Sequence, residues 1–181
     1  LGRQELSFGY IGKSFANDNH LQDNTGSAPR ANTFYTRMDG GLFHVREDPT
    51  EVGSYYTVYS REFAELASGR ILRMRAPLGM NAEAITITPV TAEGAAHPGR
   101  YRNPLPLSNG ALVASYLPQN TVPLSRNQSV RLFSLSKGAD GQLTRGTALT
   151  PGFTKTVSWW DPDNTQTFTG ELWELEPAEV V

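Results

Sequence analysis

Short segments with the alternating pattern of β-strands make up most of this chain, and helical periodicity is nearly absent. The segment 84–88 alternates strictly between isoleucine and small or hydroxyl residues, which puts both isoleucines on one face of an extended strand. The Asn109-Gly110 pair is a strong hairpin signal because both residue types accept positive φ angles. Several short strands separated by such turns predict an all-β, antiparallel fold.

The strand-like segments share aromatic, β-branched or alternating residues, and they are 6–11, 42–45, 54–59, 70–75, 84–88, 111–116, 130–135, 143–149 and 168–175. Strand–turn–strand units recur near 54–90 and 105–149, and about 40–50 residues per four-stranded unit is typical of propeller blades. We therefore expect a β-propeller-like or stacked-sheet domain that is a partial propeller of a longer parent chain. One short helix is expected over 61–68, ending at Gly69 as a C′ glycine.

The N-terminal part differs in composition from the rest of the chain. Residues 16–33 are mostly polar, with glycine and proline, and a loop of that length is either functional or mobile. We expect residues 1–45 to hold N-terminal strands around this loop, and residues 46–181 to form the antiparallel β domain. Because the chain starts at Leu1 and not at methionine, we expect it to be a processed piece of a longer protein.

Charge and cysteine content exclude several functions. The 181 residues include 16 Lys and Arg against 18 Asp and Glu, so no chain-wide positive field favours nucleic acid as a partner. No apolar run is long enough for membrane insertion. With no cysteine, the chain has no disulfide, no Cys-ligated metal and no covalent c-type haem, so we expect no cofactor within it other than the Ca²⁺ considered next.

Two groups of charged residues are candidate sites. His44, Arg46 and Asp48 alternate at the end of a predicted strand, so they share one face and form either a polar ligand-binding site or an ion-paired rim. Asp161 and Asp163 have the spacing that begins a calcium loop, which makes them candidate Ca²⁺ ligands. The glycine and glutamate that complete an EF-hand are missing, so an acidic β-turn is the alternative interpretation.

The three tryptophans have different expected roles. Trp159 and Trp160 stand beside the acidic turn, and aromatic rings next to carboxylates are suited to binding carbohydrate. Core packing is the competing interpretation, because adjacent strand residues point to opposite faces and only one ring can join a given platform. We therefore expect one of the two to be far more exposed than the other. Trp173 lies in the closing strand 168–175 and should be buried with Leu175.

Four segments carry a resemblance to a known family: GLFHVREDP (41–49), GRYRNPLPLSNG (99–110), LTPGFTKTVSWWDPD (149–163) and GELWELEPAEV (170–180). Together they resemble parts of large secreted bacterial proteins related to the alpha subunit of hydrazine synthase. The resemblance implies a β-propeller beside haem-bearing or other domains, and an extracytoplasmic location, either periplasmic or secreted. The enzyme's own chemistry belongs to haems held by Cys-x-x-Cys-His motifs, which this chain lacks, so no catalytic residue is carried over.

These observations favour a non-catalytic extracytoplasmic scaffold or protein-interaction module. Its expected partner is the remainder of the parent chain or another protein subunit. A carbohydrate- or small-ligand-binding domain is the first alternative, and an accessory domain of a haem-containing oxidoreductase-like protein is the second. The sequence contains no recognisable nucleophile–base pair and no recognisable set of metal ligands, so we do not expect this chain alone to be an enzyme.

Overall fold

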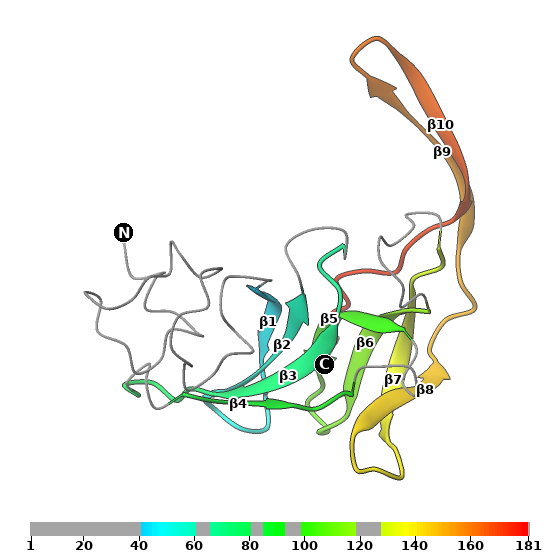
Figure 1. Ribbon diagram of the computed structural model, residues 1–181. Helices are drawn as coiled ribbons and strands as arrows, with labels where there is room; N and C mark the ends of the chain where they lie inside the picture. The colour runs from blue at the N-terminus through cyan, green and yellow to red at the C-terminus, as the bar shows by residue number, and fades with distance from the viewer. Residues whose placement is uncertain (1–40, 61–65, 81–84, 93–98, 119–127, 181) are drawn as a thin grey trace, which may run out of the picture.

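The computed structural model describes residues 41–60, 66–80, 85–92, 99–118 and 128–180 (Figure 1). These residues form ten strands in three antiparallel sheets, which confirms the expected all-β fold. The first sheet contains, in order, β1 (Gly41–Glu47), β2 (Ser54–Ser60), β3 (Arg70–Arg75) and β4 (Thr86–Pro89). The second contains β5 (Arg100–Pro106), β6 (Leu112–Leu117), β7 (Arg131–Lys137) and β8 (Leu143–Ala148). The third is a two-stranded arm of β9 (Thr154–Asp161) and β10 (Asn164–Glu171).

The core lies where the two four-stranded sheets meet. β2 and β6 are the most buried strands, as their aromatic and β-branched sequences predict. Val58 and Ile71 from the first sheet pack with Leu112 and Tyr116 from the second. The Arg145 guanidinium lies 4.9 Å from the centre of the Tyr116 ring and covers this core from the side of β8.

The two predicted hairpin turns of the second sheet are present, with one difference. Gly110 has φ +82° and Gly141 has φ +83°, whereas Asn109 has no positive φ. The Gly110 amide donates to the Leu107 carbonyl at 2.9 Å, and the Gly141 amide donates to the Gly138 carbonyl at 3.1 Å. Each turn therefore needs a single left-handed residue, and glycine supplies it without steric cost.

The predicted helix over 61–68 is wrong in the part that the structure describes, and 61–65 lie outside the described residues. Leu66 and Ala67 have φ 53° and 50°, which is left-handed turn backbone. Gly69 does not end a helix. Its amide donates to the Tyr101 carbonyl at 3.0 Å and its carbonyl accepts from the Tyr101 amide at 2.9 Å, so it bridges the two large sheets.

The predicted closing strand over 168–175 also needs correction. β10 runs only from Asn164 to Glu171, because Glu171 pairs with Thr154, the first residue of its partner strand β9. The Leu172 amide donates to the Phe153 carbonyl at 2.7 Å, which closes the base of the hairpin. The chain then returns to the second sheet, where Trp173 packs against the buried Leu117 and Val130. Leu175, expected to be buried beside Trp173, is 38% exposed.

The two four-stranded sheets repeat one arrangement. In each, four antiparallel strands follow chain order, and the first strand carries a bulge in which two residues oppose one residue of the second strand. The bulge lies between Phe43 and Arg46 in β1, and between Arg102 and Leu105 in β5. The recurring units therefore run from 41 to 89 and from 100 to 148, and each starts with a strand that the sequence units of 54–90 and 105–149 left out or cut short. The described sheets do not close into a ring (Figure 1).

Some sequence predictions concern other parts of the chain. The strand over 6–11 and the polar loop over 16–33 lie outside the described residues. The boundary placed after residue 45 falls inside β1, which spans Gly41–Glu47. In the part of the chain that the structure describes, no helix is long and apolar enough to cross a membrane.

Candidate functional site

Three polar side chains from distant segments meet beside the bulges. His44 lies in the bulge of β1, Asn103 in the bulge of β5, and Glu176 in the segment that follows the arm. Asn103 Nδ2 lies 2.9 Å from His44 Nδ1 and also donates to Glu176 Oε1. Arg46 Nη2 donates to Glu176 Oε2 at 3.1 Å. We call His44, Arg46, Asn103 and Glu176 the bulge cluster.

Three of the four residues of the bulge cluster, His44, Asn103 and Glu176, have left-handed backbone with positive φ. Leu66 and Ala67 are the other non-glycine residues with positive φ in the described ranges, and the Ala67 carbonyl contacts His44. Left-handed backbone is uncommon for such residues and costs about 1–3 kcal/mol each. Strain of this kind persists only where surrounding contacts hold it, which makes the bulge cluster the first candidate for a functional feature.

The hydrogen bonds define the protonation of His44. Its Nε2 lies 3.2 Å from the Ala67 carbonyl oxygen, which only accepts, so Nε2 carries the hydrogen. Nδ1 is then an acceptor and takes the second hydrogen bond from the Asn103 amide group. The Asn103 side chain is buried, and its Oδ1 has no partner among the described atoms. The cluster thus joins β1, β5 and the 172–177 segment through one amide.

Burial is the main reason that the pKa of His44 is lowered from 6.5. The positive charge of Arg102 lowers it further, and Arg46 adds a smaller effect in the same direction. The Ala67 carbonyl and the Glu176 carboxylate oppose these effects without overcoming them. His44 is therefore neutral at pH 7, in agreement with its role as an acceptor.

We expect the folded protein to lose stability as the pH falls through 6.5 toward the lowered pKa of His44. The unfolded state binds a proton there more readily than the folded state, so protonation favours unfolding. Urea titrations of the wild type and His44→Gln between about pH 7.5 and about pH 5.5 measure this. The wild type should lose more stability than the variant over that range. Equal losses in both would contradict the neutral, buried imidazole.

The expected trio of His44, Arg46 and Asp48 is only partly assembled. His44 and Arg46 both reach Glu176, but Asp48 lies just past the end of β1 at Glu47, where the alternation of the strand no longer applies. Asp48 is buried, and its Oδ1 accepts from the Thr50 amide at 2.9 Å and from the Thr50 hydroxyl at 2.6 Å.

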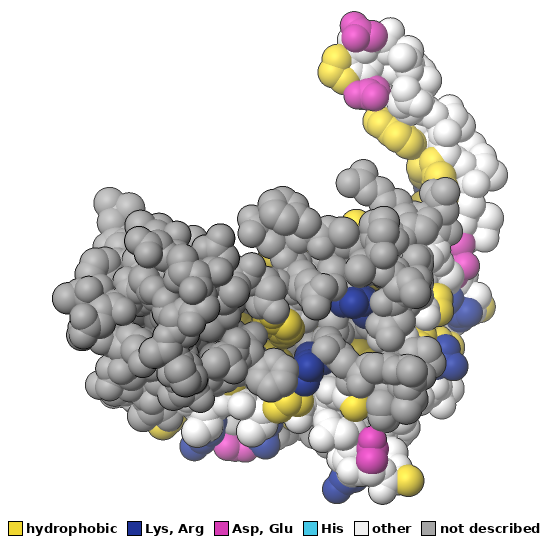
Figure 2. Space-filling model, viewed as in Figure 1, with side chains coloured by type: hydrophobic (Ala, Val, Ile, Leu, Met, Phe, Trp, Pro, Cys, Tyr) yellow, Lys and Arg dark blue, Asp and Glu magenta, His cyan; other side chains and the backbone are white. Residues whose placement is uncertain are grey.

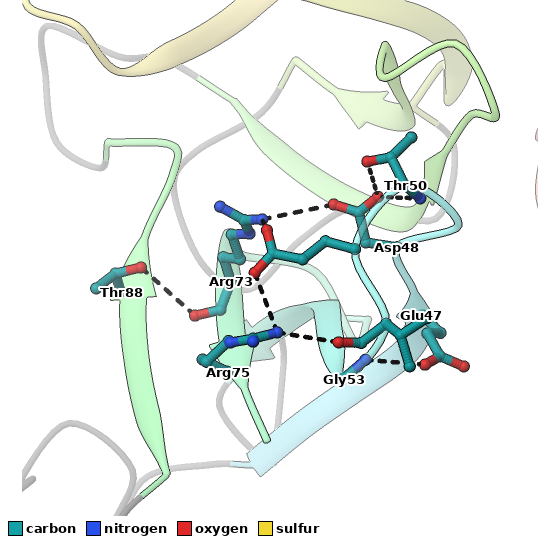
Figure 3. A network of polar contacts seen from close by, with 9 residues as sticks. Glu47, Asp48, Thr50, Gly53, Arg73, Arg75 and Thr88 are labelled. Atoms are coloured by element: carbon teal, nitrogen blue, oxygen red, sulfur yellow. Dashed lines mark hydrogen bonds and ion pairs between the residues drawn. The ribbon is translucent and has the colours of Figure 1, made fainter. Parts of the chain in front are cut away.

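Asp48 belongs to a separate ion-pair network at one end of the first sheet (Figure 3). Arg73 lies 3.7 Å from Asp48 and also pairs with Glu51, and Arg75 lies 3.0 Å from Glu51. A pocket of about 190 Å³ beside the network is lined partly by these same residues and by Thr88. Two carboxylates face two guanidinium groups, so the charges balance within the network. It is therefore better suited to fixing the β1–β2 turn than to binding a charged ligand.

The arm carries the other predicted residues. Trp159 and Trp160 lie on β9 and are 50% and 71% exposed, so both are exposed where one was expected to be far more so than the other. The reason is that the arm projects away from the two large sheets, and neither of its faces is covered by another described strand (Figure 1). Asp161 and Asp163 stand at the tip of the arm, where 161 and 164 are paired and 162–163 form the predicted turn.

No group of three or more His, Asp or Glu side chains with metal-binding geometry occurs in the described ranges. Asp161 and Asp163 are both exposed, and the structure brings no third carboxylate to them. The two tip carboxylates are therefore at most part of a Ca²⁺ site.

Asn103 and Glu176 were missed by the sequence analysis. Pro104 lies inside a strand, and proline within a strand is typical of a bulge, so the Asn103-Pro104 pair was a usable signal. Glu176 also precedes a proline, Pro177. Nothing in the local sequence, however, indicates that these residues meet His44.

Comparison of the chain with protein-family models, with curated proteins and with solved structures found no match.

Proposed function

We propose that this chain is a non-catalytic β-propeller-type scaffold that assembles with another polypeptide segment. The two four-stranded sheets are successive blade units, and the 172–177 segment acts as the first strand of a third unit. Three segments occupying equivalent places carry the proposal.

The equivalence of 172–177 with β5 rests on two contacts. Tyr101 of β5 bonds through its amide to the carbonyl of Gly69, the residue directly before β3, at 2.9 Å. Glu174 bonds through its amide to the carbonyl of Val130, the residue directly before β7, also at 2.9 Å. Asn103 lies two residues after Tyr101, and Glu176 lies two residues after Glu174. Asn103 and Glu176 therefore occupy equivalent positions in the two segments.

The bulge cluster supports the same interpretation. His44, Asn103 and Glu176 hold the same place in the three segments and share positive φ angles of 56°, 46° and 51°, and Asn103 bonds to both of the others. A polar cluster that joins the first strands of neighbouring units fixes their spacing. Among the described residues it contains a neutral imidazole and a carboxylate already paired with Arg46, without a nucleophile, which favours a structural role over catalysis.

The equivalence also defines the partner. In the first two units, the opening strand pairs with a buried antiparallel strand, β2 or β6. The 172–177 segment has no such strand among the described residues. We propose that another polypeptide segment supplies it, with aromatic or β-branched residues like those of β2. Strand addition to a free edge is an established mode of recognition, because main-chain hydrogen bonds supply the affinity.

A peptide titration tests this proposal. The ¹⁵N-labelled chain is titrated with a synthetic peptide of the β2 sequence, residues 54–60, and with a scrambled peptide of the same composition. Saturable amide shifts should concentrate in 172–177 with the β2 peptide and be absent with the scrambled one. Shifts spread over both large sheets, or none at all, would contradict a third-unit strand at this place.

The resemblance to secreted propeller proteins is what supports an extracytoplasmic location for this scaffold. It also supports a role as an accessory domain beside a haem-containing oxidoreductase-like domain in the same assembly. The scaffold proposal itself rests on the bulge cluster and the repeated units, and it does not depend on the location or on a haem-containing neighbour.

Carbohydrate binding by the arm is the second candidate. Two exposed indole rings near the carboxylates of Asp161 and Asp163 favour it, since a sugar ring stacks on an indole and its hydroxyls bond to carboxylates. The rings occupy opposite faces of β9, so each offers a platform of one ring.

A glycan array with the wild type and a Trp159→Ala/Trp160→Ala double variant tests carbohydrate binding by the arm. Signals that are lost in the variant would support carbohydrate binding.

A further inference from the structure

The β9–β10 arm is an unusually exposed element. It is a two-stranded ribbon of eight residues per strand, roughly 27 Å long at about 3.4 Å per residue. An isolated hairpin of this kind is marginally stable in water, and unpaired strand edges are normally covered or blunted. Both outer edges of the arm lack a partner strand in the described part of the chain.

The two faces of the arm differ. On one face, Val157 pairs with Phe168, and Trp159 pairs with Gln166. On the other, hydroxyls bond across the strands, with Thr156 to Thr169 at 2.9 Å and Ser158 to Thr167 at 3.0 Å. Figure 2 shows this division, with hydrophobic side chains along the inner curve of the arm and acidic groups at its tip. One face of the arm is therefore mainly apolar and the other mainly hydroxyl, with Trp160 as the one apolar ring on the hydroxyl face.

The sequence of β9 is complementary to itself in antiparallel pairing. If two copies pair about a two-fold axis at Ser158, each Lys155 stands opposite the other copy's Asp161, and each Val157 stands opposite the other Trp159. Thr156 then stands opposite Trp160. Opposite charges and aromatic–β-branched pairs are the favourable cross-strand combinations. This register contains two Lys155–Asp161 pairs and two Val157–Trp159 pairs, and it opposes no like charges.

We propose that the arm binds a second copy of this chain by β9–β9 pairing, which makes one four-stranded sheet across a two-fold axis. A two-fold interface uses the same patch on both copies, and β9 pairs with itself in this way from Lys155 to Asp161. The apolar faces of the two arms join into one continuous strip, because a two-fold axis normal to the sheet keeps like faces together. This inference is separate from the proposed function, which concerns 172–177 and not the arm.

The β10 edge is a poorer place for such pairing. A two-fold register about Thr167 would oppose Gln166 to Phe168 and contain no charge pair. It would also bring Asp163 of one copy opposite Glu171 of the other, and like charges directly opposite are destabilising. The two edges thus differ in charge complementarity, and β9 is favoured.

Cysteine crosslinking in the full chain tests the register, since the chain has no natural cysteine. In the Ser158→Cys variant the two introduced thiols face each other across the axis, with Cβ atoms about 4.5–5.5 Å apart. Thr167→Cys is the matched control, because Thr167 is the direct neighbour of Ser158 in the same row. Its two thiols would be about 14 Å apart, three strand spacings, which is too far for a disulfide. Mild oxidation should crosslink the first variant and leave the control monomeric.

Charge reversal tests the same pairing without oxidation. Lys155→Asp and Asp161→Lys each oppose like charges, so each variant alone should sediment as a monomer at concentrations where the wild type dimerises. An equal mixture of the two restores both ion pairs and should sediment as a heterodimer, and the double variant should dimerise as the wild type does. Lys137→Asp, on the distant β7, is the control that should leave dimerisation unchanged.

Several outcomes would overturn the proposal. A wild type that stays monomeric at all concentrations would do so, as would equal crosslinking of both cysteine variants. Failure of the Lys155→Asp and Asp161→Lys mixture to associate would show that β9 does not pair in this register. Binding of a glycan that requires Trp159 and excludes dimerisation would assign the arm to carbohydrate instead. None of these results bears on the peptide titration at 172–177.

Discussion

Replacing Trp173 with alanine should lower the free energy of unfolding by about 3 kcal/mol, the lower end of the range for tryptophan in a core. The ring is half buried against Leu117 and Val130, and its Nε1 donates to the Gln128 carbonyl at 2.9 Å. The Arg102 guanidinium lies 5.8 Å from the ring centre and adds a cation–π contact. Alanine removes all three interactions and leaves the 172–177 segment held to the second sheet mainly by the hydrogen bonds of Glu174.

Urea titrations of three matched variants measure this effect. Trp160→Ala, on the exposed arm, should stay within about 0.5 kcal/mol of the wild type, as surface substitutions usually do. Trp173→Phe keeps an aromatic ring but loses the hydrogen bond, so its loss should be intermediate. Equal destabilisation by Trp173→Ala and Trp160→Ala would show that the arm is part of the core, which would also remove the basis for arm pairing.

Local patterns in the sequence predict the strands well, because alternation and turn residues act over a few neighbours. β3 spans Arg70–Arg75 as predicted, and Gly110 and Gly141 close the predicted turns. The β9 strand was missed as a full strand because Trp159 and Trp160 were interpreted through the turn that follows them. The alternation in β9 is weak, because Trp160 stands on its hydroxyl face and the charged Lys155 and Asp161 flank Val157 and Trp159 on the other.

The bulge cluster could not be predicted in the same way. His44 and Asn103 are 2.9 Å apart in space but belong to different repeats, and only the two bulges bring their side chains together. Asp48 left the expected trio for another reason: β1 ends at Glu47, and the Asp48 carboxylate accepts hydrogen bonds from Thr50 just past the strand. Pattern analysis of one strand assumes regular pairing throughout, and it therefore fails at a bulge and past the end of the strand.

Replacing Gly69 with alanine should be among the most destabilising single changes in the described chain. A Cβ atom at this buried position would collide with the carbonyl oxygen of Tyr59, which is backbone and cannot rotate away. Relief requires β2 and β3 to separate at the Tyr59–Arg70 pair, or Gly69 to leave its two hydrogen bonds with Tyr101. Overpacking of this kind costs about 1–3 kcal/mol and sometimes more, and we expect a loss of about 3 kcal/mol.

Gly41→Ala is the matched control, because a Cβ there meets only the Phe43 ring at an ordinary 3.8 Å. Alanine reduces the freedom of the unfolded chain, so this variant should be neutral or stabilised by up to about 1 kcal/mol. Amide exchange adds a local readout: Gly69→Ala should accelerate exchange at Tyr101, whose amide bonds to Gly69 across the two sheets. If both variants unfold at the same urea concentration and Tyr101 stays protected, the close approach of Gly69 to Tyr59 is wrong.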